Sequence, residues 1–114
     1  MNHSLKTALL VTVTALACVA RNAAAEQVVE PTELVDQQHC MFCHTPDTPF
    51  LAPSFHQIAE RYRDTPNAHL MLEDKLRRGG RAHWGNTPMP LAAERGGPLS
   101  AEDAKRLIDW VMSQ

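Results

Sequence analysis

The sequence has few aromatic residues and no large excess of charge of either sign. Three Phe, two Trp and one Tyr among 114 residues give the chain little material for a large core of its own. Eleven Lys and Arg stand against thirteen Asp and Glu, so the formal net charge is −2. Nucleic-acid-binding domains usually carry a strongly basic face or tail. We therefore expect no nucleic-acid partner.

Long hydrophobic runs are also lacking. The longest apolar stretch, residues 7–20, spans about 14 residues, whereas a membrane-spanning helix needs about 20. A short cationic segment precedes it, and the small residues Ala23-Ala24-Ala25 follow it, which is the order of a secretory signal. We expect residues 1–25 to be a cleaved Sec signal peptide, leaving one domain of residues 26–114 with no stable membrane insertion. A lipid anchor on Cys18 is the lesser alternative.

Cysteine is scarce, and two of the three cysteines form one motif. Cys40 and Cys43 are followed directly by His44, in the run Cys40-Met41-Phe42-Cys43-His44. This is the attachment signature of c-type haem. On a helix, thiols three residues apart lie on one face and can reach the two haem vinyl groups, and the adjacent imidazole can bind the iron. We predict one covalent haem c held by Cys40 and Cys43, with His44 as an iron ligand.

Other chemistries also use paired cysteines. An exported protein with two cysteines can hold a disulfide. A zinc site needs a further Cys or His at metal-ligand spacing, and none is evident. A thioredoxin-like redox pair belongs in a βαβ pattern, whereas this sequence shows no strand pattern. The combination of an export signal, a small chain and a following histidine favours haem.

The remaining pattern is that of short helices and long loops. We predict an all-α domain of about four helices wrapped around the haem, whose apolar body supplements the small core. The expected helices cover residues 31–44, 54–63, 67–78 and 100 onward. Ser54, Asn67 and Ser100 are typical N-caps, Gly79-Gly80 ends the third helix, and residues 81–98 are expected to be irregular. The expected buried faces contain Leu34, Val35, Phe55, Ile58, Ala59, Tyr62, Leu72, Leu76, Ala104, Leu107, Ile108 and Val111.

A second iron ligand has to come from a methionine or a histidine. The candidates are Met41, Met71, Met89, Met112, His39, His56, His69 and His83. Met89 stands in a loop that Pro88 and Pro90 stiffen on both sides. Methionines on predicted helices are more typical of core filler. The residues alone favour Met89, with His83 in the same loop as the strongest alternative.

Taken together, these motifs resemble small bacterial class I cytochromes c of the c-551/552 type. The resemblance covers nearly all of residues 35–114. It rests on the attachment motif, on Ala52-Pro53, on Trp84-Gly85-Asn86-Thr87-Pro88-Met89-Pro90 and on Trp110-Val111-Met112-Ser113-Gln114. It implies the class I cytochrome c fold and strengthens the assignment of Met89 as the second ligand.

The resemblance also implies roles for residues around the haem. The Pro53 carbonyl is expected to accept a hydrogen bond from His44, and the Trp84 indole to donate to a haem propionate. Lys75 falls where the family has an arginine near a propionate, and a lysine lacks the planar fork. Ala92 stands where family members often have an asparagine that reaches the ligand sulfur, so that bond is not expected here.

Function follows from this coordination. His44 and Met89 would fill both axial positions, and the sequence offers no nucleophilic triad, carboxylate pair or phosphate loop. We expect a periplasmic one-electron carrier, not an enzyme, that meets donor and acceptor redox proteins transiently and has no small-molecule substrate. The alternatives are an electron-transfer subunit of a larger periplasmic oxidoreductase and a haem sensor or enzyme with a labile methionine.

Charge is distributed unevenly along the chain. Basic residues gather near the end of the third predicted helix and after it: Lys75, Arg77, Arg78, Arg81 and Arg95. Acidic residues gather near the start of the domain: Glu26, Glu30, Glu33 and Asp36. The basic cluster predicts salt-dependent docking to an acidic surface of a redox partner.

Overall fold

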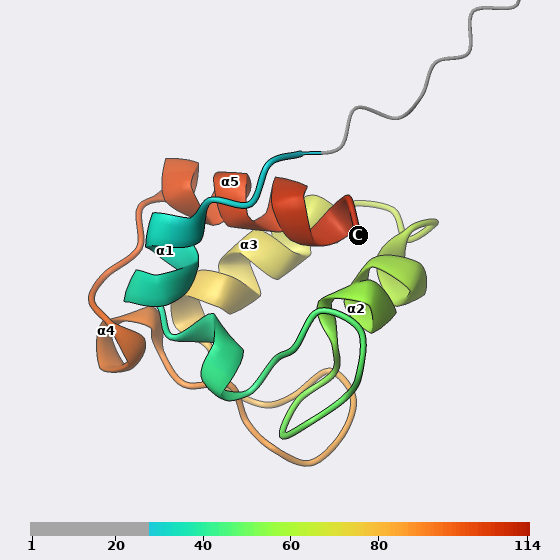
Figure 1. The fold of residues 1–114 in the computed structure, drawn as a ribbon, viewed down its shortest axis with the longest axis horizontal. Coiled ribbons are helices and arrows are strands. Elements are labelled where there is room, and N and C mark those ends of the chain that lie inside the picture. Colours follow the sequence, from blue (N-terminus) through green and yellow to red (C-terminus); the bar gives the residue numbers. More distant parts are fainter. Residues whose placement is uncertain (1–27) are drawn as a thin grey trace, which may run out of the picture.

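The structure, a computed structural model, describes residues 28–114, so the expected signal segment 1–25 lies outside the described residues. This part of the chain folds into helices and loops without a β-strand (Figure 1). The elements are α1 (Thr32–Gln37), the 3₁₀ helix η1 (Cys40–Phe42), α2 (Phe55–Tyr62), α3 (Ala68–Arg78), α4 (Ala92–Arg95) and α5 (Ala101–Met112). The predicted all-α class is confirmed. Between residues 28 and 114, no helix is both long and apolar enough to span a bilayer.

Helices α2 and α5 begin as their sequences predict. The Ser54 side chain accepts from the Gln57 backbone N–H at 3.1 Å, and the Gln57 side chain accepts from the Ser54 N–H at 3.0 Å, which forms a capping box. Ser100 accepts from the Asp103 N–H at 3.0 Å. Helix α3 does begin after Asn67, but this residue has φ 58° and its side chain caps nothing. The predicted boundary is therefore right and the predicted cap is wrong.

The first predicted helix, residues 31–44, is too long. Helix α1 ends at Gln37, and His39 adopts a left-handed conformation with φ 51°. That conformation interrupts the α-helical hydrogen-bond ladder, so the chain turns and begins η1 at Cys40. The Gln38 side chain is fully buried, and its Nε2 donates to the Gly97 carbonyl at 3.0 Å. The attachment motif thus occupies its own turn instead of the end of a long helix.

The segment expected to be irregular, residues 81–98, holds more structure than predicted. Gly80 and Met89 pair as an isolated antiparallel bridge. Helix α4 begins where the Leu91 backbone N–H donates to the Glu94 carboxylate at 3.1 Å. The described chain therefore has five α-helices where about four were expected.

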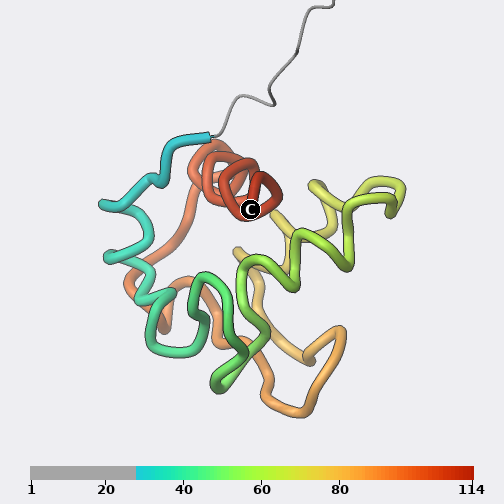
Figure 2. Tube along the Cα trace, turned by 45° about the vertical axis from the view of Figure 1, so that its right-hand side comes forward, coloured from blue at the N-terminus to red at the C-terminus, as the bar shows by residue number. Residues whose placement is uncertain are grey.

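Helix α5 lies at the centre of the packing, against α2 and α3 on one side and α1 on the other (Figure 2). The predicted inward faces are buried, with Ile58 partly buried against the core. Trp110 on α5 is also buried, at 5% exposure, and its ring packs against the ring of Phe55 on α2. The core therefore lies mainly between the helices, and the long loops 43–54 and 79–91 extend from it.

Candidate functional site

A cavity of about 690 Å³ opens between the two long loops. Its volume falls in the range of about 300–1,000 Å³ in which a protein encloses most of a bound ligand. One wall comes from η1 and the loop after it, and the facing wall comes from residues 82–90, with α2, α3 and α5 behind. All the residues of the predicted site line this cavity: Cys40, Cys43, His44, Pro53, Lys75, Trp84 and Met89.

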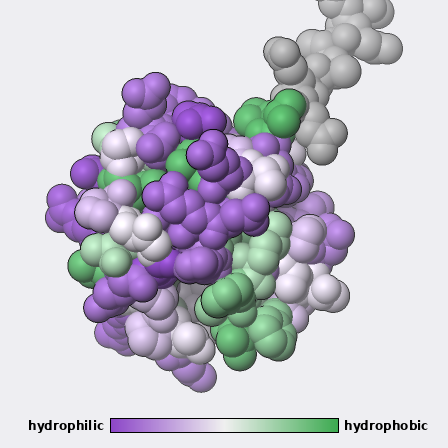
Figure 3. Space-filling model, turned by 60° about the vertical axis from the view of Figure 1, so that its left-hand side comes forward, coloured by the Kyte–Doolittle hydropathy of each residue, from purple (hydrophilic) through white to green (hydrophobic). Residues whose placement is uncertain are grey.

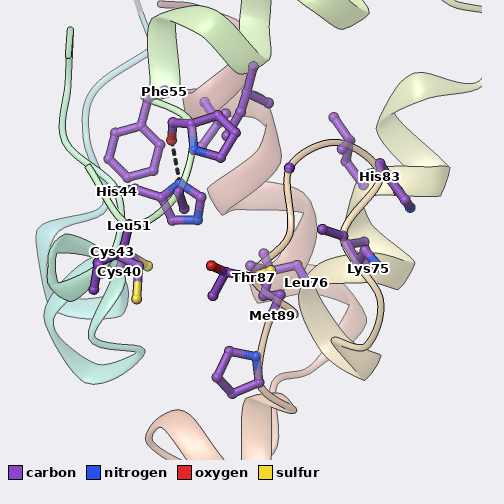
Figure 4. Close-up of a pocket in the computed structure, with 18 of the residues that line it drawn as sticks. Cys40, Cys43, His44, Leu51, Phe55, Lys75, Leu76, His83, Thr87 and Met89 are labelled. Carbon is purple, nitrogen blue, oxygen red and sulfur yellow. Dashed lines mark hydrogen bonds between the residues drawn. The ribbon is translucent and has the colours of Figure 1, made fainter. Parts of the chain in front are cut away.

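The two cysteines lie on the first wall beside His44 (Figure 4). Both are free and partly buried. The turn is closed by backbone hydrogen bonds from the N–H groups of Cys43 (3.3 Å) and His44 (3.0 Å) to the Cys40 carbonyl. Burial raises the pKa of the Cys40 thiol, partly offset by the positive charge of Arg95. Two thiols and an imidazole therefore share one wall, as covalent haem attachment requires.

The His44 ring is oriented by a hydrogen bond. Its Nδ1 lies 2.6 Å from the Pro53 carbonyl oxygen, the contact that the family resemblance implies (Figure 4). Since Nδ1–H donates there, the lone pair is left on Nε2. Burial lowers the pKa of His44, against the opposing effect of the Pro53 bond and with a smaller contribution from the charge of Arg95. A neutral imidazole with a fixed ring and a free Nε2 is the form that binds a metal.

Packing behind His44 makes this wall rigid. The Phe55 ring stacks on His44 with centroids 5.4 Å apart and lies 4.8 Å from the Trp110 ring. The loop is tied back by the Ala52 N–H to the Cys43 carbonyl at 3.0 Å and by the Phe55 N–H to the Thr45 carbonyl at 3.0 Å. The His44 imidazole is therefore packed against the hydrophobic core through Phe55.

Met89 lies on the facing wall (Figure 4). It exchanges two backbone hydrogen bonds with Gly80, at 2.7 and 2.9 Å. Gly79 has φ 60°, and a Cβ built on it would lie 2.5 Å from the carbonyl oxygens of both Met89 and Pro90. Only glycine fits such a position. The end of α3 therefore fixes the base of the methionine loop.

Met89 is the one methionine of residues 28–114 that lines the cavity. Met41 and Met71 are exposed, and Met112 packs on the core. Among the histidines, His56 and His69 face carboxylates outside the cavity. The same residues 28–114 hold no group of three or more His, Cys, Asp or Glu arranged for a metal, so the zinc alternative gains no support.

Comparison with known proteins is consistent with this geometry. The family model "Cytochrome c" matches residues 28–114. The chain belongs to the cytochrome c family. It is 32% identical to cytochrome c-552 of Nitrosomonas europaea over 81 residues, 71% of this chain and 75% of that protein. It is also 32% identical to cytochrome c-551 of Azotobacter vinelandii, over 71% of this chain and 93% of that one.

The fold agrees with the sequence match. The crystal structure of wild-type Nitrosomonas europaea cytochrome c552 superimposes with a TM-score of 0.63, covering 72% of this chain and 96% of that one. The protein is thus a class I cytochrome c and an electron carrier, not an enzyme. As in its family, one haem c is attached through the CxxCH motif, here by Cys40 and Cys43.

The other candidate haem contacts of this cytochrome c have local partners. The Arg61 guanidinium carbon lies 4.4 Å from the centre of the Trp84 ring, at cation–π distance. The Lys75 ammonium donates to the carbonyls of Gly79, at 3.4 Å, and Arg81. Lys75 therefore secures the end of α3, which the sequence did not predict.

His83 lines the cavity but is turned to a neighbouring side chain. Its Nδ1 lies 3.2 Å from the Tyr62 hydroxyl oxygen. Desolvation lowers the pKa of His83, and the charges of Lys75 and Arg61 lower it further. In Figure 4 Met89 lies nearer to His44 than His83 does. The contact with Tyr62 uses only Nδ1 of His83, so the choice of Met89 over His83 stays a prediction.

The rim of the cavity is apolar. Phe42, Phe50 and Leu51 all line it and are 71%, 66% and 56% exposed. Most of the surface in Figure 3 is hydrophilic, and one of the groups of hydrophobic side chains on that face lies in its lower part. Large apolar side chains at a cavity edge shield a bound apolar group from water. The sequence did not single out these residues.

Arg95 is the main site residue that sequence reasoning missed. It was assigned to the basic surface cluster, but it is half-buried and lines the cavity. Burial lowers its pKa, and its charge acts on both Cys40 and His44. The one available signal was its place in Glu94-Arg95-Gly96-Gly97, a charged pair inside the loop that follows Met89.

Proposed function

We propose that this cytochrome c is an exported, periplasmic one-electron carrier whose haem iron is ligated by His44 and Met89. The observation that carries the proposal is the placement of Met89 across the cavity from a neutral, oriented His44. Bound in this way, the haem supplies a one-electron Fe(III)/Fe(II) couple, with a potential raised by the thioether relative to a second imidazole. With both His44 and Met89 bound to it, the iron would have no free position for a substrate.

Several residues that line the cavity have their own proposed roles in holding the haem. Cys40 and Cys43 attach the group, and Pro53 fixes the ring of His44 and raises its basicity as a ligand. The apolar rim and the Phe55 side chain exclude water. Trp84 lines the cavity, and its indole N–H is proposed to donate to a haem propionate. A pocket that holds both ligands in place keeps the geometry similar in the two oxidation states.

Residues 1–25 are the proposed signal for export. The partners are donor and acceptor proteins met through small, transient interfaces. The cluster of Lys75, Arg77, Arg78 and Arg81, without the half-buried Arg95, is proposed to steer an acidic partner, so the association rate should fall as salt is added. Stable co-purification with a catalytic subunit would instead support the oxidoreductase-subunit alternative.

The test compares holoprotein matured in a bacterial periplasm with its Met89→Ala variant. The wild type should be low-spin, should show a ferric thioether-to-iron charge-transfer band and should not bind carbon monoxide when reduced. Met89→Ala should lose the band and bind carbon monoxide, because it removes the proposed thioether ligand. Met71→Ala is the matched control, since Met71 is exposed on α3 and does not line the cavity.

Two results would contradict the proposal. A high-spin ferric wild type or ready binding of carbon monoxide would mean that Met89 is not a firm ligand, and the sensor or enzyme alternative would replace the carrier. A charge-transfer band that survives in Met89→Ala would assign the second ligand to another residue.

A further inference from the structure

One side chain connects the walls of the haem cavity. The Arg95 guanidinium donates to three backbone carbonyls: from Nε to Pro90 at 3.2 Å, from Nη1 to Gln38 at 3.5 Å, and from Nη2 to Leu76. The first partner is five residues from Arg95, whereas the others are 57 and 19 residues from it. Three separate segments thus meet at one cation.

Each of these carbonyls lies next to a part of the site. Pro90 follows Met89 directly, Gln38 precedes the attachment turn, and Leu76 belongs to the last turn of α3. Carbonyls in the last turn of a helix have no partner within the helix and need one from outside. A guanidinium presents several N–H donors in a rigid plane, so one arginine can satisfy carbonyls in different directions. A lysine has a single nitrogen and cannot reproduce this arrangement.

The methionine loop has few other anchors. Within the described chain, the backbone of residues 81–88 takes part in no backbone–backbone hydrogen bond. Met89 itself is held by its pair of bonds to Gly80. Beyond that pair, the hydrogen bond from Arg95 to Pro90 holds the residue that follows Met89. This bond lies at an exposed position, but it is charge-assisted, which makes it stronger than a neutral bond.

We propose that Arg95 is a positioning residue that holds the Met89 thioether in place by fastening Pro90 to the attachment turn and to the end of α3. The proposal rests on the proposed ligation of the iron by Met89. Arg95 does not touch the iron; it acts through the loop. Loss of its planar donor set should therefore let the thioether leave the iron more often, with the covalent attachment of the haem unchanged.

The test uses the ferric holoprotein and its Arg95→Lys variant, which keeps the positive charge. Arg77→Lys is the matched control, because Arg77 also donates to a backbone carbonyl, from Nε to Leu99 at 3.0 Å, but does not line the cavity. Stopped-flow absorbance would follow displacement of the thioether by added imidazole, and urea unfolding would report global stability. We expect displacement to be about tenfold faster in Arg95→Lys, the effect of losing one hydrogen bond to a charged group. Displacement should change by less than about twofold in Arg77→Lys, within the range of a surface substitution.

A measurement on the wild type applies even where Arg95→Lys fails to mature. The Arg95 Nε–H proton, followed by NMR, should exchange with water more slowly with Met89 bound than with imidazole bound. Equal exchange in the two states, or equal displacement rates in the two lysine variants, would overturn the positioning role. Failure of the ligation proposal looks different: the charge-transfer band would be absent from the wild type or present in Met89→Ala.

Discussion

The two walls of the haem cavity are built by different means. The wall that carries His44 is part of the hydrophobic core, since Phe55 and Trp110 behind it are 3% and 5% exposed. The facing wall is a loop whose residues 85–88 are all exposed. It is anchored at its base by Gly80 and Arg95, and along its length only by side-chain contacts of His83 and Trp84.

This difference predicts which ligand is mobile. Displacing His44 requires breaking its bond to Pro53 and repacking Phe55, which disturbs the core. Displacing Met89 requires only local movement of a segment with few hydrogen bonds. Such segments open at a much lower free energy than the whole protein unfolds. Ligand exchange and tuning of the potential should therefore belong to the Met89 wall, and global stability to the His44 wall.

The largest expected effect is on the His44 wall. Phe55→Ala should lower the free energy of unfolding by about 3–5 kcal/mol, because it removes a buried ring that contacts both His44 and Trp110. Urea unfolding of the holoprotein would measure it. Leu70→Ala is the control, because Leu70 is 67% exposed and its loss should cost less than about 0.5 kcal/mol. A cost for Phe55→Ala that is no larger than the control's would mean that this wall is not part of the core.

A smaller effect is expected at the base of the Met89 wall, from a comparison of two glycines with similar φ angles. Gly79 and Gly85 have φ 60° and 75°, so alanine at either position costs at least about 1–2 kcal/mol for the positive φ. At Gly79 the new Cβ would also meet the carbonyls of Met89 and Pro90 at 2.5 Å, whereas nothing lies within 4 Å at Gly85. We expect Gly79→Ala to be destabilised by about 1–3 kcal/mol more than Gly85→Ala, the usual cost of overpacking.

Spectroscopy adds a second measurement to this pair. Gly79→Ala should weaken the thioether-to-iron charge-transfer band, because the loop must shift to relieve the contact. Gly85→Ala should leave the band unchanged. Equal bands and equal stabilities in the two variants would show that the base of the loop does not position Met89.

The sequence predicted the parts of the fold that depend on local signals. Helices α2, α3 and α5 have amphipathic periodicity and clear boundaries, and they were placed correctly to within a few residues. The break at His39 was not predicted, because its left-handed conformation is accompanied by burial of Gln38 against Gly97, a contact between distant segments. Helix α4 was missed for a similar reason: a four-residue helix in a Gly- and Pro-rich segment has too few residues to show a period.

The same distinction holds at the candidate site. Cys40, Cys43 and His44 form a contiguous motif, and Met89 is marked by its flanking prolines. All of them line the cavity, although their roles as ligands stay predictions until tested. Apart from its place between Glu94 and Gly96, Arg95 carries no local signal, since its carbonyl partners in Gln38 and Leu76 are brought to it only by the tertiary fold. The sequence groups Arg95 with surface cations, whereas in the structure it is half-buried and donates to three backbone carbonyls.

The smallest effect is expected away from both walls, on the outer face of α5. Lys105 pairs there with Asp109, which also lies 3.3 Å from His69 on α3. The hydrogen bond to Asp109, the charge of Asp109 and the charge of Glu73 raise the pKa of Lys105 above its ordinary value of 10.5. A raised pKa in the folded state stabilises the protein below pH 10.5, and this contribution is lost as the pH rises through the folded-state pKa.

Lys105→Gln should thus be slightly less stable than the wild type in urea at pH 8, by less than either glycine variant, and the difference should disappear at strongly alkaline pH. The charge-transfer band at pH 8 should match that of the wild type; a weakened band would show that the scaffold and the Met89 wall are coupled, and the separation between the two walls would have to be abandoned.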